Sequence, residues 1–260
     1  MSGRVKRREV EGEDGWRVVT HGLRRLNVGN EAGKKKGTGK EIAGRVPSQI
    51  VKDVTGEKLL GEFGGLRGRW RDTAVARQVE GLVGKRGWSG KSAVCIGIGS
   101  FSRDWENRWR SLWQLVLFIH VVEHFGKEGE VKMYAQDPAF IRLDKEFLKH
   151  LNITTLETGI ENYITPDSFV YSPFVDWFVL LPTFLATKDP AVYVGNEILD
   201  DYTAYAQTQD KKDKLSECNE LGRIFLKDRD MVKLNDFEHH AHALSGMVMY
   251  HSTNEELLPT

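Results

Sequence analysis

The stretch from Ala93 to Ser102 restricts the fold of this chain more than any other. Its first four residues are apolar and partly β-branched, which favours a short strand covered on both faces. Gly97 and Gly99 follow, and glycine permits a tight turn and the close approach of another backbone or a ligand. Ser100 or Ser102 is suited to cap a helix after the turn. A strand, a Gly-x-Gly turn and a helix predict the opening of a nucleotide-type α/β fold.

The rest of the chain continues this alternation. Apolar residues at spacings of three and four predict a long helix from Arg103 to Phe125, which Gly126 ends. Asp137 and Pro138 are placed to begin another helix, as N-cap and first-turn residue. Further helices are predicted at 69–83, from 175 to a kink or end at Pro182, at 198–205 and at 211–225. Further strands are predicted at 131–135, 153–156, 169–171, 191–194 and 231–234. The pattern predicts a Rossmann-like, mostly parallel sheet with helices on both faces.

The chain divides by composition into three parts. Residues 1–45 are rich in Gly, Lys, Arg and Glu and poor in large apolar residues, so we expect a disordered basic tail. Its basic clusters suit either a nuclear import signal or a solvated surface, and Trp16 is its one candidate docking residue. Residues 46–90 are expected to form a partly helical lead-in, and residues 91–260 the α/β domain.

Composition excludes several classes of function. Lys and Arg together number 37, as do Asp and Glu, so no overall basic field favours nucleic acid as a partner. No apolar run reaches the roughly 20 residues of a membrane span, and no signal peptide is visible. The two cysteines, Cys95 and Cys218, are far apart, which predicts reduced thiols and a cytoplasmic or nuclear location.

Four turns follow the predicted strands and should meet at one edge of the sheet, where α/β proteins bind ligands. They are Gly97–Ser102, Gln136–Pro138, Tyr171–Phe174 and Gly195–Glu197. The residues we assign to a small nucleotide-like ligand are Gly97, Gly99, Ser100, Ser102, Arg103, Gln114, Asp137, Pro138, Tyr171, Gly195 and Asn196.

This edge could also be a packing feature without a ligand. Position 102 is serine where the dinucleotide fingerprint has its third glycine, and Asp137 lies well beyond the roughly 20 residues expected for a ribose-binding acid. NAD is therefore disfavoured. Arg103 and Arg108 add positive charge for an anion. The alternative is a tight turn chosen for packing, with Asp137 capping a helix.

Two histidine groups are candidate metal sites. His120, Glu123 and His124 match the H-x-x-E-H zinc pattern and would need a third ligand, for which Glu197 is available. The competing interpretation places His120 at the edge of a core. A second tract, His239-His240-Ala241-His242 with His251 later, suits either a metal or a solvated turn before a last helix.

Aromatic stacking on a ligand and nucleophilic catalysis have less support in the sequence. The tryptophans could stack on a ring-shaped ligand, although a helical stripe favours core packing. These are Trp105, Trp109, Trp113 and Trp177. No Gly-x-Ser-x-Gly elbow, P-loop lysine or Cys-x-x-Cys pair is present, so nucleophilic catalysis and P-loop hydrolysis have no support.

Taken together, several motifs resemble the SRR-like family, named for sensitivity to red light reduced. The matching pieces are Cys95-Ile96-Gly97-Ile98-Gly99-Ser100-Phe101-Ser102, Gln114-Leu115, Tyr134-Ala135-Gln136-Asp137-Pro138-Ala139-Phe140 and Val192-Tyr193-Val194-Gly195-Asn196-Glu197. The resemblance covers about residues 90–200, with a weaker echo in Asp14-Gly15-Trp16, and looks closest to fungal members. It implies a Rossmann-like domain and regulatory roles, including light signalling and circadian timing in plants.

One departure limits what the resemblance implies. Many relatives carry a proline-histidine-cysteine element after the fourth strand, where this chain has Ser172-Pro173-Phe174. A metal or haem contact by that histidine or cysteine therefore does not carry over.

We expect an intracellular regulatory protein that acts mainly through protein partners, with a small-ligand pocket at the strand ends. The alternative is a nucleotide- or S-adenosylmethionine-binding enzyme or sensor of the same fold. The sequence identifies no cofactor.

Overall fold

The computed structural model describes residues 7–11, 17–21, 50–84, 90–103, 105–126 and 131–253. The chain forms two compact units, Met1–Ser48 and Gln49–Thr260. In the first unit, strands β1 (Arg7–Glu11) and β2 (Arg17–His21) pair antiparallel, an element not predicted from the sequence. The rest of the predicted tail, including Trp16, lies outside the described residues.

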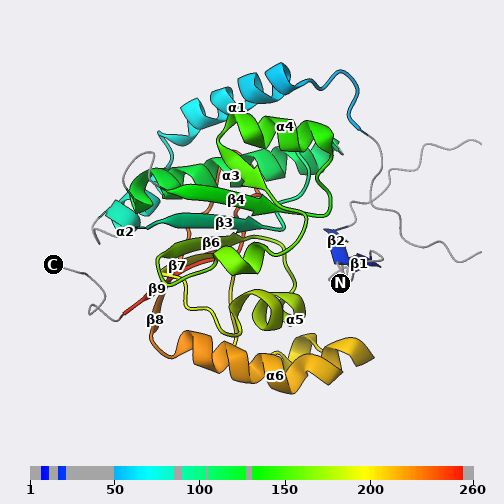
Figure 1. The fold of residues 1–260 in the computed structure, drawn as a ribbon, viewed down its shortest axis with the longest axis vertical. Coiled ribbons are helices and arrows are strands. Elements are labelled where there is room, and N and C mark those ends of the chain that lie inside the picture. The colour runs from blue at the N-terminus through cyan, green and yellow to red at the C-terminus, as the bar shows by residue number, and fades with distance from the viewer. Residues whose placement is uncertain are drawn as a thin grey trace, which may run out of the picture. The chain divides into compact units, whose positions relative to one another are not determined.

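The second unit is built around a seven-stranded sheet in the order β5-β4-β3-β6-β7-β9-β8 (Figure 1). The strands are β3 (Ser92–Ile96), β4 (Lys132–Gln136), β5 (Ile153–Thr155), β6 (Ser168–Ser172), β7 (Val192–Asn196), β8 (Arg229–Lys233) and β9 (Met247–Ser252). Strands β3 to β7 are parallel, and β9 runs antiparallel to both β7 and β8. The predicted mostly parallel α/β sheet is confirmed. The predicted last strand is β8, and β9 follows it where a last helix was expected.

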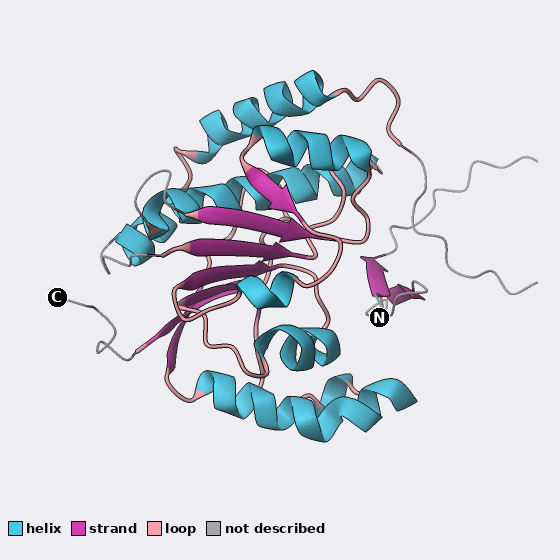
Figure 2. Cartoon of the chain, viewed as in Figure 1, coloured by secondary structure: helices cyan, strands magenta, loops and turns pink. Residues whose placement is uncertain are grey.

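Helices cover both faces of the sheet, as Figures 1 and 2 show. One face carries α1 (Gly56–Trp70), α2 (Ala74–Val83), α3 (Trp105–Phe125) and α4 (Arg142–His150). The other carries α5 (Trp177–Val179), which continues as a π-helix over Leu180–Leu185, and α6 (Gln209–Leu226). No helix among the described residues is long and apolar enough to cross a membrane.

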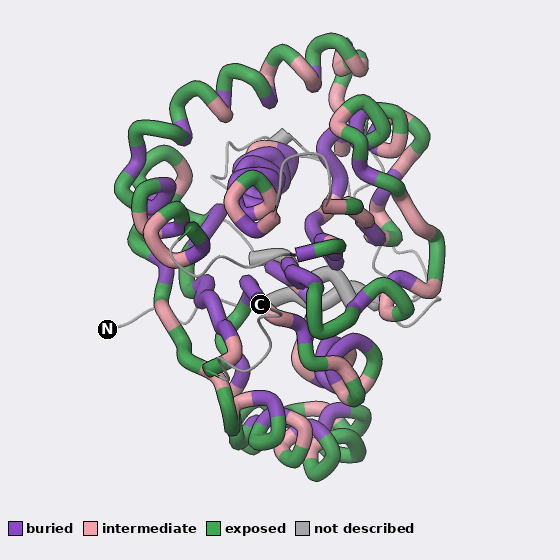
Figure 3. The backbone as a smooth tube through the Cα atoms, turned by 60° about the vertical axis from the view of Figure 1, so that its left-hand side comes forward, coloured by how far each residue is buried: buried purple, intermediate pink, exposed green. Residues whose placement is uncertain are grey.

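The long helix α3 forms the centre of the larger helical layer. Every residue from Ser111 to Val121 is buried, because α3 lies between the sheet and the outer helices α1 and α2. Figure 3 shows it as the buried helix beneath α1. The apolar periodicity that predicted this helix therefore reflects burial on several sides.

Several helix predictions need correction. The single helix expected at 69–83 is two helices, because the Thr73 hydroxyl donates to the Trp70 carbonyl and accepts from the Ala76 amide, which starts α2. Residues 198–205 form only a short 3-10 turn, Thr203–Tyr205. Pro182 lies within the π-helix.

Two helical glycines test the packing directly. A Cβ on Gly222 of α6 would lie 2.2 Å from the Leu199 carbonyl oxygen, whereas a Cβ on Gly61 of α1 would meet nothing within 4 Å. We predict that Gly61→Ala raises the free energy of unfolding by about 0.5–1 kcal/mol through helix propensity, and that Gly222→Ala lowers it despite the same propensity gain. Urea denaturation measures both. Equal stabilisation by the two variants would contradict the close packing of α6 on the 198–202 loop.

Candidate functional site

The carboxyl ends of β3, β4, β6 and β7 lie at one edge of the sheet, because these strands are parallel. The four turns named from the sequence follow these strands and therefore meet at that edge. In α/β sheets this edge is the usual ligand-binding region. The geometry of the turns decides what this edge can bind.

The turn after β3 requires glycine at two positions. Gly97 and Gly99 have φ values of 71° and 83°, in the left-handed region that glycine adopts without strain. The space beside them is also filled. A Cβ on Gly97 would lie 2.7 Å from Cγ2 of Val175, and one on Gly99 would lie 2.9 Å from Oγ of Ser111. Side chains of the protein therefore approach this turn closely.

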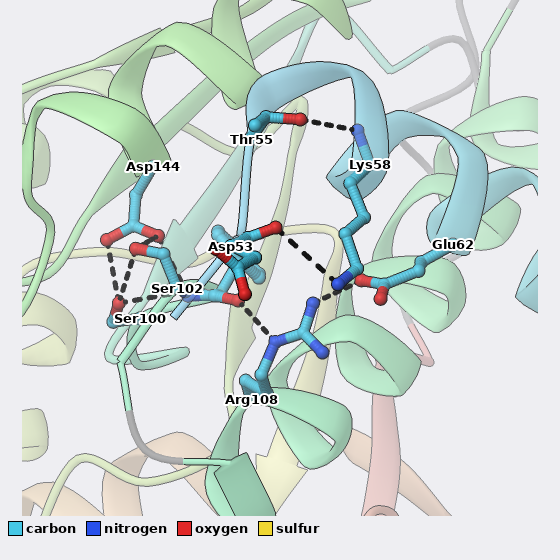
Figure 4. A network of polar contacts seen from close by, with 9 residues as sticks. Asp53, Thr55, Lys58, Glu62, Ser100, Ser102, Arg108 and Asp144 are labelled. Carbon is cyan, nitrogen blue, oxygen red and sulfur yellow. Dashed lines mark hydrogen bonds and ion pairs between the residues drawn. The ribbon is translucent and has the colours of Figure 1, made fainter. Parts of the chain in front are cut away.

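A buried carboxylate, Asp144 of α4, binds the same turn. It is fully buried and accepts hydrogen bonds from the Ser100 hydroxyl at 2.7 Å, the Phe101 amide at 2.9 Å and the Ser102 hydroxyl at 2.8 Å (Figure 4). The Ile141 amide, at the start of α4, donates a fourth bond at 3.0 Å. Asp144 thus joins the β3 turn to the beginning of α4.

Sequence reasoning missed Asp144. Its partners in the turn lie 42 to 44 residues earlier in the chain. The one local signal was an acidic residue in the first turn of a helix, where a carboxylate can bind the preceding amide. That signal predicts a helix start and says nothing of the contact with the turn.

Neither serine of the turn caps α3, which corrects the sequence-based expectation. The helix begins at Trp105, whereas the Ser100 hydroxyl accepts from the amides of Ser102 and Arg103 at 3.2 and 3.1 Å. The serines instead hold the turn together and donate to Asp144. Because of this, their hydroxyl groups are already used within the protein.

Asp137 also differs from its predicted role as a helix cap. The helix after it begins at Arg142, and the Asp137 carboxylate accepts from the Gly99 amide at 2.6 Å and the Ala139 amide at 2.7 Å. It therefore closes the β3 and β4 turns onto each other. The Gly97 amide donates in turn to the Gln136 carbonyl at 3.1 Å, so the two turns share a second bond.

The surroundings of Asp137 disfavour the ionised form of its carboxyl group. Burial raises the pKa of this carboxyl from 3.8 to about 6, the amides of Ala139 and Gly99 lower it, and the nearby Asp144 carboxylate raises it. The stability from the protonated form is therefore fully present below pH 3.8 and is lost as the pH rises through about 6. Asp144 therefore lies close enough to Asp137 for their charges to repel.

The buried cation of the site is already paired. Arg108 of α3 is fully buried, and its Nε donates to the Phe101 carbonyl at 3.0 Å. Its guanidinium also forms an ion pair with Glu62 of α1 (Figure 4). Arg108, considered above for an anion, thus ties α1 and α3 to the turn.

Two other predicted ligand residues lie inside the protein. The Gln114 amide nitrogen donates to the Ala243 carbonyl at 2.8 Å, and the Tyr171 hydroxyl donates to the Met247 sulfur at 3.7 Å. Both side chains have 0% exposure. Burial raises the pKa of Tyr171 well above its ordinary value, so its hydroxyl stays protonated.

The remaining predicted residues lie at the edge. Pro138 and Asn196 are exposed, and Arg103 is half-buried with its amide on Ser100. A Cβ on Gly195 would lie 2.3 Å from the Ser172 carbonyl oxygen, so this glycine permits close strand packing. The structure thus brings Asp137 together with the Gly97–Ser102 turn, and buries Gln114 and Tyr171 in the protein interior.

The histidine groups are held by protein contacts. His120 is 5% exposed, with its Nε2 at 3.3 Å from the Ala76 carbonyl and its ring edge-on to Trp70. Burial lowers its pKa. His239 stacks on Trp113, in a loop that precedes strand β9 and not a helix. Across the described part of the chain, no group of three His, Cys, Asp or Glu side chains could hold a metal ion.

The tryptophans weighed for ligand stacking pack within the protein. Trp113 is 3% exposed and lies 4.8 Å from the Phe237 ring, and Trp177 stacks on Tyr202 at 4.6 Å. Trp113 is therefore a core residue, whereas Trp177 of α5 is half-buried. The side chain of Trp105 lies outside the described residues.

These features define a Rossmann-like α/β protein. Its turn after β3 is held by hydrogen bonds to the carboxylates of Asp137 and Asp144. The SRR1 domain matches residues 76–251 of the sequence, and the chain belongs to the SRR1 domain family. The resemblance noted from the motifs is confirmed at this level, and the fungal variety stays a prediction.

Comparison with solved structures finds similar folds at low identity. An O-methyltransferase from Bacillus cereus in complex with SAH has a TM-score of 0.41 and 13% identity, covering 79% of this chain and 93% of its own. Cofactor-bound Rv0187 from MTB has a TM-score of 0.39 and 11% identity, covering 75% and 89%. These likenesses concern the fold alone. No curated protein matches the chain.

We predict that Asp144→Asn lowers the free energy of unfolding by about 1–3 kcal/mol, because the new NH2 group faces donors that a carboxylate had satisfied. The matched control is Glu146→Gln on the same helix, whose exposed ion pair with Arg142 at 2.7 Å should contribute less than about 1 kcal/mol. Chemical denaturation of both variants checks this. Similar small losses would show that the Asp144 network does not stabilise the fold.

Proposed function

We propose that this SRR1-domain chain is an intracellular regulatory protein that acts mainly through protein partners, and that its first turn is not a phosphate site. One observation supports the proposal that the turn does not bind phosphate. The amides of Gly99 and Phe101, which would face a phosphate, donate instead to the carboxylates of Asp137 and Asp144. Light signalling and circadian timing, implied by the resemblance to plant relatives, stay predictions, as does a cytoplasmic or nuclear location.

The electrostatics of the turn support this proposal. An anion binds at a helix N-terminus because free amides and a positive potential favour it. Here the amides of Gly99 and Phe101 already donate to the side chains of Asp137 and Asp144, which add negative charge beside the turn. Two unit charges about 4 Å apart repel by about 4 kcal/mol near a protein surface. Of the two cations considered for an anion, Arg108 is paired with Glu62. The buried Nε of Arg103 has no hydrogen-bond partner among the described residues.

A role through partners agrees with the regulatory roles that the family resemblance implies. The described surface also exposes large apolar side chains, with Ile224 of α6 62% and Met231 of β8 48% accessible. Both cysteines are free and buried, as suits a reducing compartment. These features support binding by surface contact and leave the turn with a structural role.

A second candidate function is binding of a nucleoside without phosphates, S-adenosylmethionine among them. The observation that favours it is Asp137, which is partly exposed at the end of β4 beside Gly99. A carboxylate there can accept hydrogen bonds from ribose hydroxyls, and negative potential suits a sulfonium cation. The buried Gln114 carbonyl oxygen has no hydrogen-bond partner among the described residues.

A thermal-shift screen with ATP, NAD, S-adenosylmethionine, adenosine and haem tests the proposal. We expect no rise in melting temperature with ATP or NAD, because the Gly99 and Phe101 amides already donate to carboxylates of the protein. A ligand at a hundredfold excess over its Kd adds about 2.7 kcal/mol of stability, which such a screen detects. A clear shift with ATP or NAD would contradict the proposal.

A shift confined to S-adenosylmethionine or adenosine would instead favour the second candidate. The variant Asp137→Ala should then lose that shift, since it removes the carboxylate that would bind the ribose. Glu146→Gln serves again as the control that keeps it.

A further inference from the structure

Strand β8 (Arg229–Lys233) lies at one end of the seven-stranded sheet and pairs only with β9. Each of its five residues has a partner in β9, so no bulge interrupts the strand. Asp230, Met231 and Lys233 are exposed, and Met231, in the middle of the strand, is 48% accessible. The outer edge of β8 therefore faces solvent.

The hydrogen bonds at the two ends of this ladder show which main-chain groups of β8 point outward. The Leu234 amide donates to the Met247 carbonyl at 3.0 Å, and the Thr253 amide donates to the Asp228 carbonyl at 3.0 Å. Main-chain groups point to alternate sides along an antiparallel strand, so the even-numbered residues of β8 bond to β9. The amides and carbonyls of the odd-numbered residues therefore point away from the sheet.

One of these outward groups already has a partner. The Gln78 side chain of α2 donates to the Lys233 carbonyl at 2.9 Å. Within the described part of the chain, the outward main-chain groups of Arg229 and Met231 make no hydrogen bond. Met231 thus presents a donor and an acceptor at an exposed position, and such an edge is a template for a further strand.

The open groups of β8 are self-complementary. When two copies pair antiparallel about a two-fold axis at Met231, all five residues pair, and the two Met231 residues exchange both hydrogen bonds. The Lys233 amide of each copy then meets the Arg229 carbonyl of the other. An axis at Asp230 would place two carboxylates opposite each other, which destabilises a strand pair. An axis at Val232 would direct the Met231 amide to the Lys233 carbonyl, which already accepts from α2.

The side chains agree with an axis at Met231. Arg229 would lie opposite Lys233 of the second copy, but its guanidinium forms an ion pair with Asp189 and its Cζ lies 4.3 Å from the centre of the Phe225 ring. The Arg229 side chain is only 2% accessible, so its charge adds little repulsion. At the axis itself, the two exposed Met231 side chains would cover each other and bury apolar surface.

We propose that two copies of this chain associate through β8, so that their sheets join into one continuous sheet across a two-fold axis at Met231. An identical strand is the occupant that supplies a partner for each open group of Met231. A strand pair with few side chains is a small interface, and small interfaces form weak, reversible complexes. Three strands separate β8 from β3, so the inference does not rest on the proposed role of the turn after β3.

Sedimentation velocity of the full chain at rising concentration measures this association. We expect a reversible equilibrium between monomer and dimer without larger species, because a two-fold pair uses the β8 edge of both copies. A chain that remains monomeric up to about 1 mM, or that forms larger oligomers, would overturn the proposal.

Two variants test whether main-chain hydrogen bonds hold the dimer. Met231→Pro removes the outward amide and leaves the bonds to β9, whereas Met231→Leu keeps that amide and an apolar side chain. Proline removes two hydrogen bonds from the symmetric pair, so we expect the dissociation constant to rise about thirtyfold and leucine to leave it unchanged. Equal dissociation constants for the two variants, at equal melting temperature, would contradict strand pairing.

Met231→Cys tests the register and keeps the proposal falsifiable if proline unfolds the chain. Hydrogen-bonded antiparallel pairs have Cα atoms about 5.5 Å apart, a distance that a disulfide spans. We expect mild oxidation to join Met231→Cys chains into dimers. The control is Lys149→Cys at an exposed position on α4, which should stay monomeric, since both native cysteines are buried. No cross-link at position 231, or equal cross-linking at position 149, would overturn the proposed pairing.

Discussion

The buried carboxylate of Asp144 is the interaction on which the first turn of the sheet depends. Four donors from the turn and from the start of α4 surround it, and no ion pair of Asp144 occurs within the described part of the chain. Burying this carboxylate without hydrogen-bond donors would destabilise the folded protein. Burying the donors without the carboxylate would also destabilise it, because they would lack an acceptor. The turn and the helix therefore fix each other.

Other contacts extend from this point. Asp137 joins the turns after β3 and β4, and Arg108 joins the same turn to α3 and, through Glu62, to α1. The side chain of Val175, which follows strand β6, fills the space beside Gly97. A turn that resembles a nucleotide-binding opening in sequence is thus occupied by the protein's own groups. The hydrogen bonds of the Gly99 and Phe101 amides therefore hold this edge of the sheet in shape.

Much of the fold could be predicted from the sequence because its signals are local. The central strands β3, β6 and β7 are short, largely apolar and buried, and α3 and α6 have clear apolar periodicity and ends. The break between α1 and α2 depends on one hydroxyl, that of Thr73, and the antiparallel β9 depends on pairing across the sheet. Neither leaves a distinct local pattern.

The candidate site was only partly predictable for the same reason. The sequence located Gly97, Gly99 and Asp137 at one edge, since parallel strands end there. It could not show that Asp137 points at the Gly99 amide, or that Asp144 reaches Phe101 from another helix. Contacts between residues about forty positions apart are set by tertiary packing, and Gln114 and Tyr171 were assigned to a ligand because their burial was not visible.

The most direct measurement follows the backbone amide resonances of Gly99 and Phe101 by NMR, first during a pH titration and then with added ATP. Burial raises the pKa of Asp137 to about 6. The Gly99 resonance should therefore move with a midpoint near that pH, and Asp137→Asn should abolish the movement. ATP at neutral pH should leave both amides unchanged. Saturable shifts of both amides with ATP, and none with pH, would contradict the conclusion that the protein's own carboxylates occupy this turn.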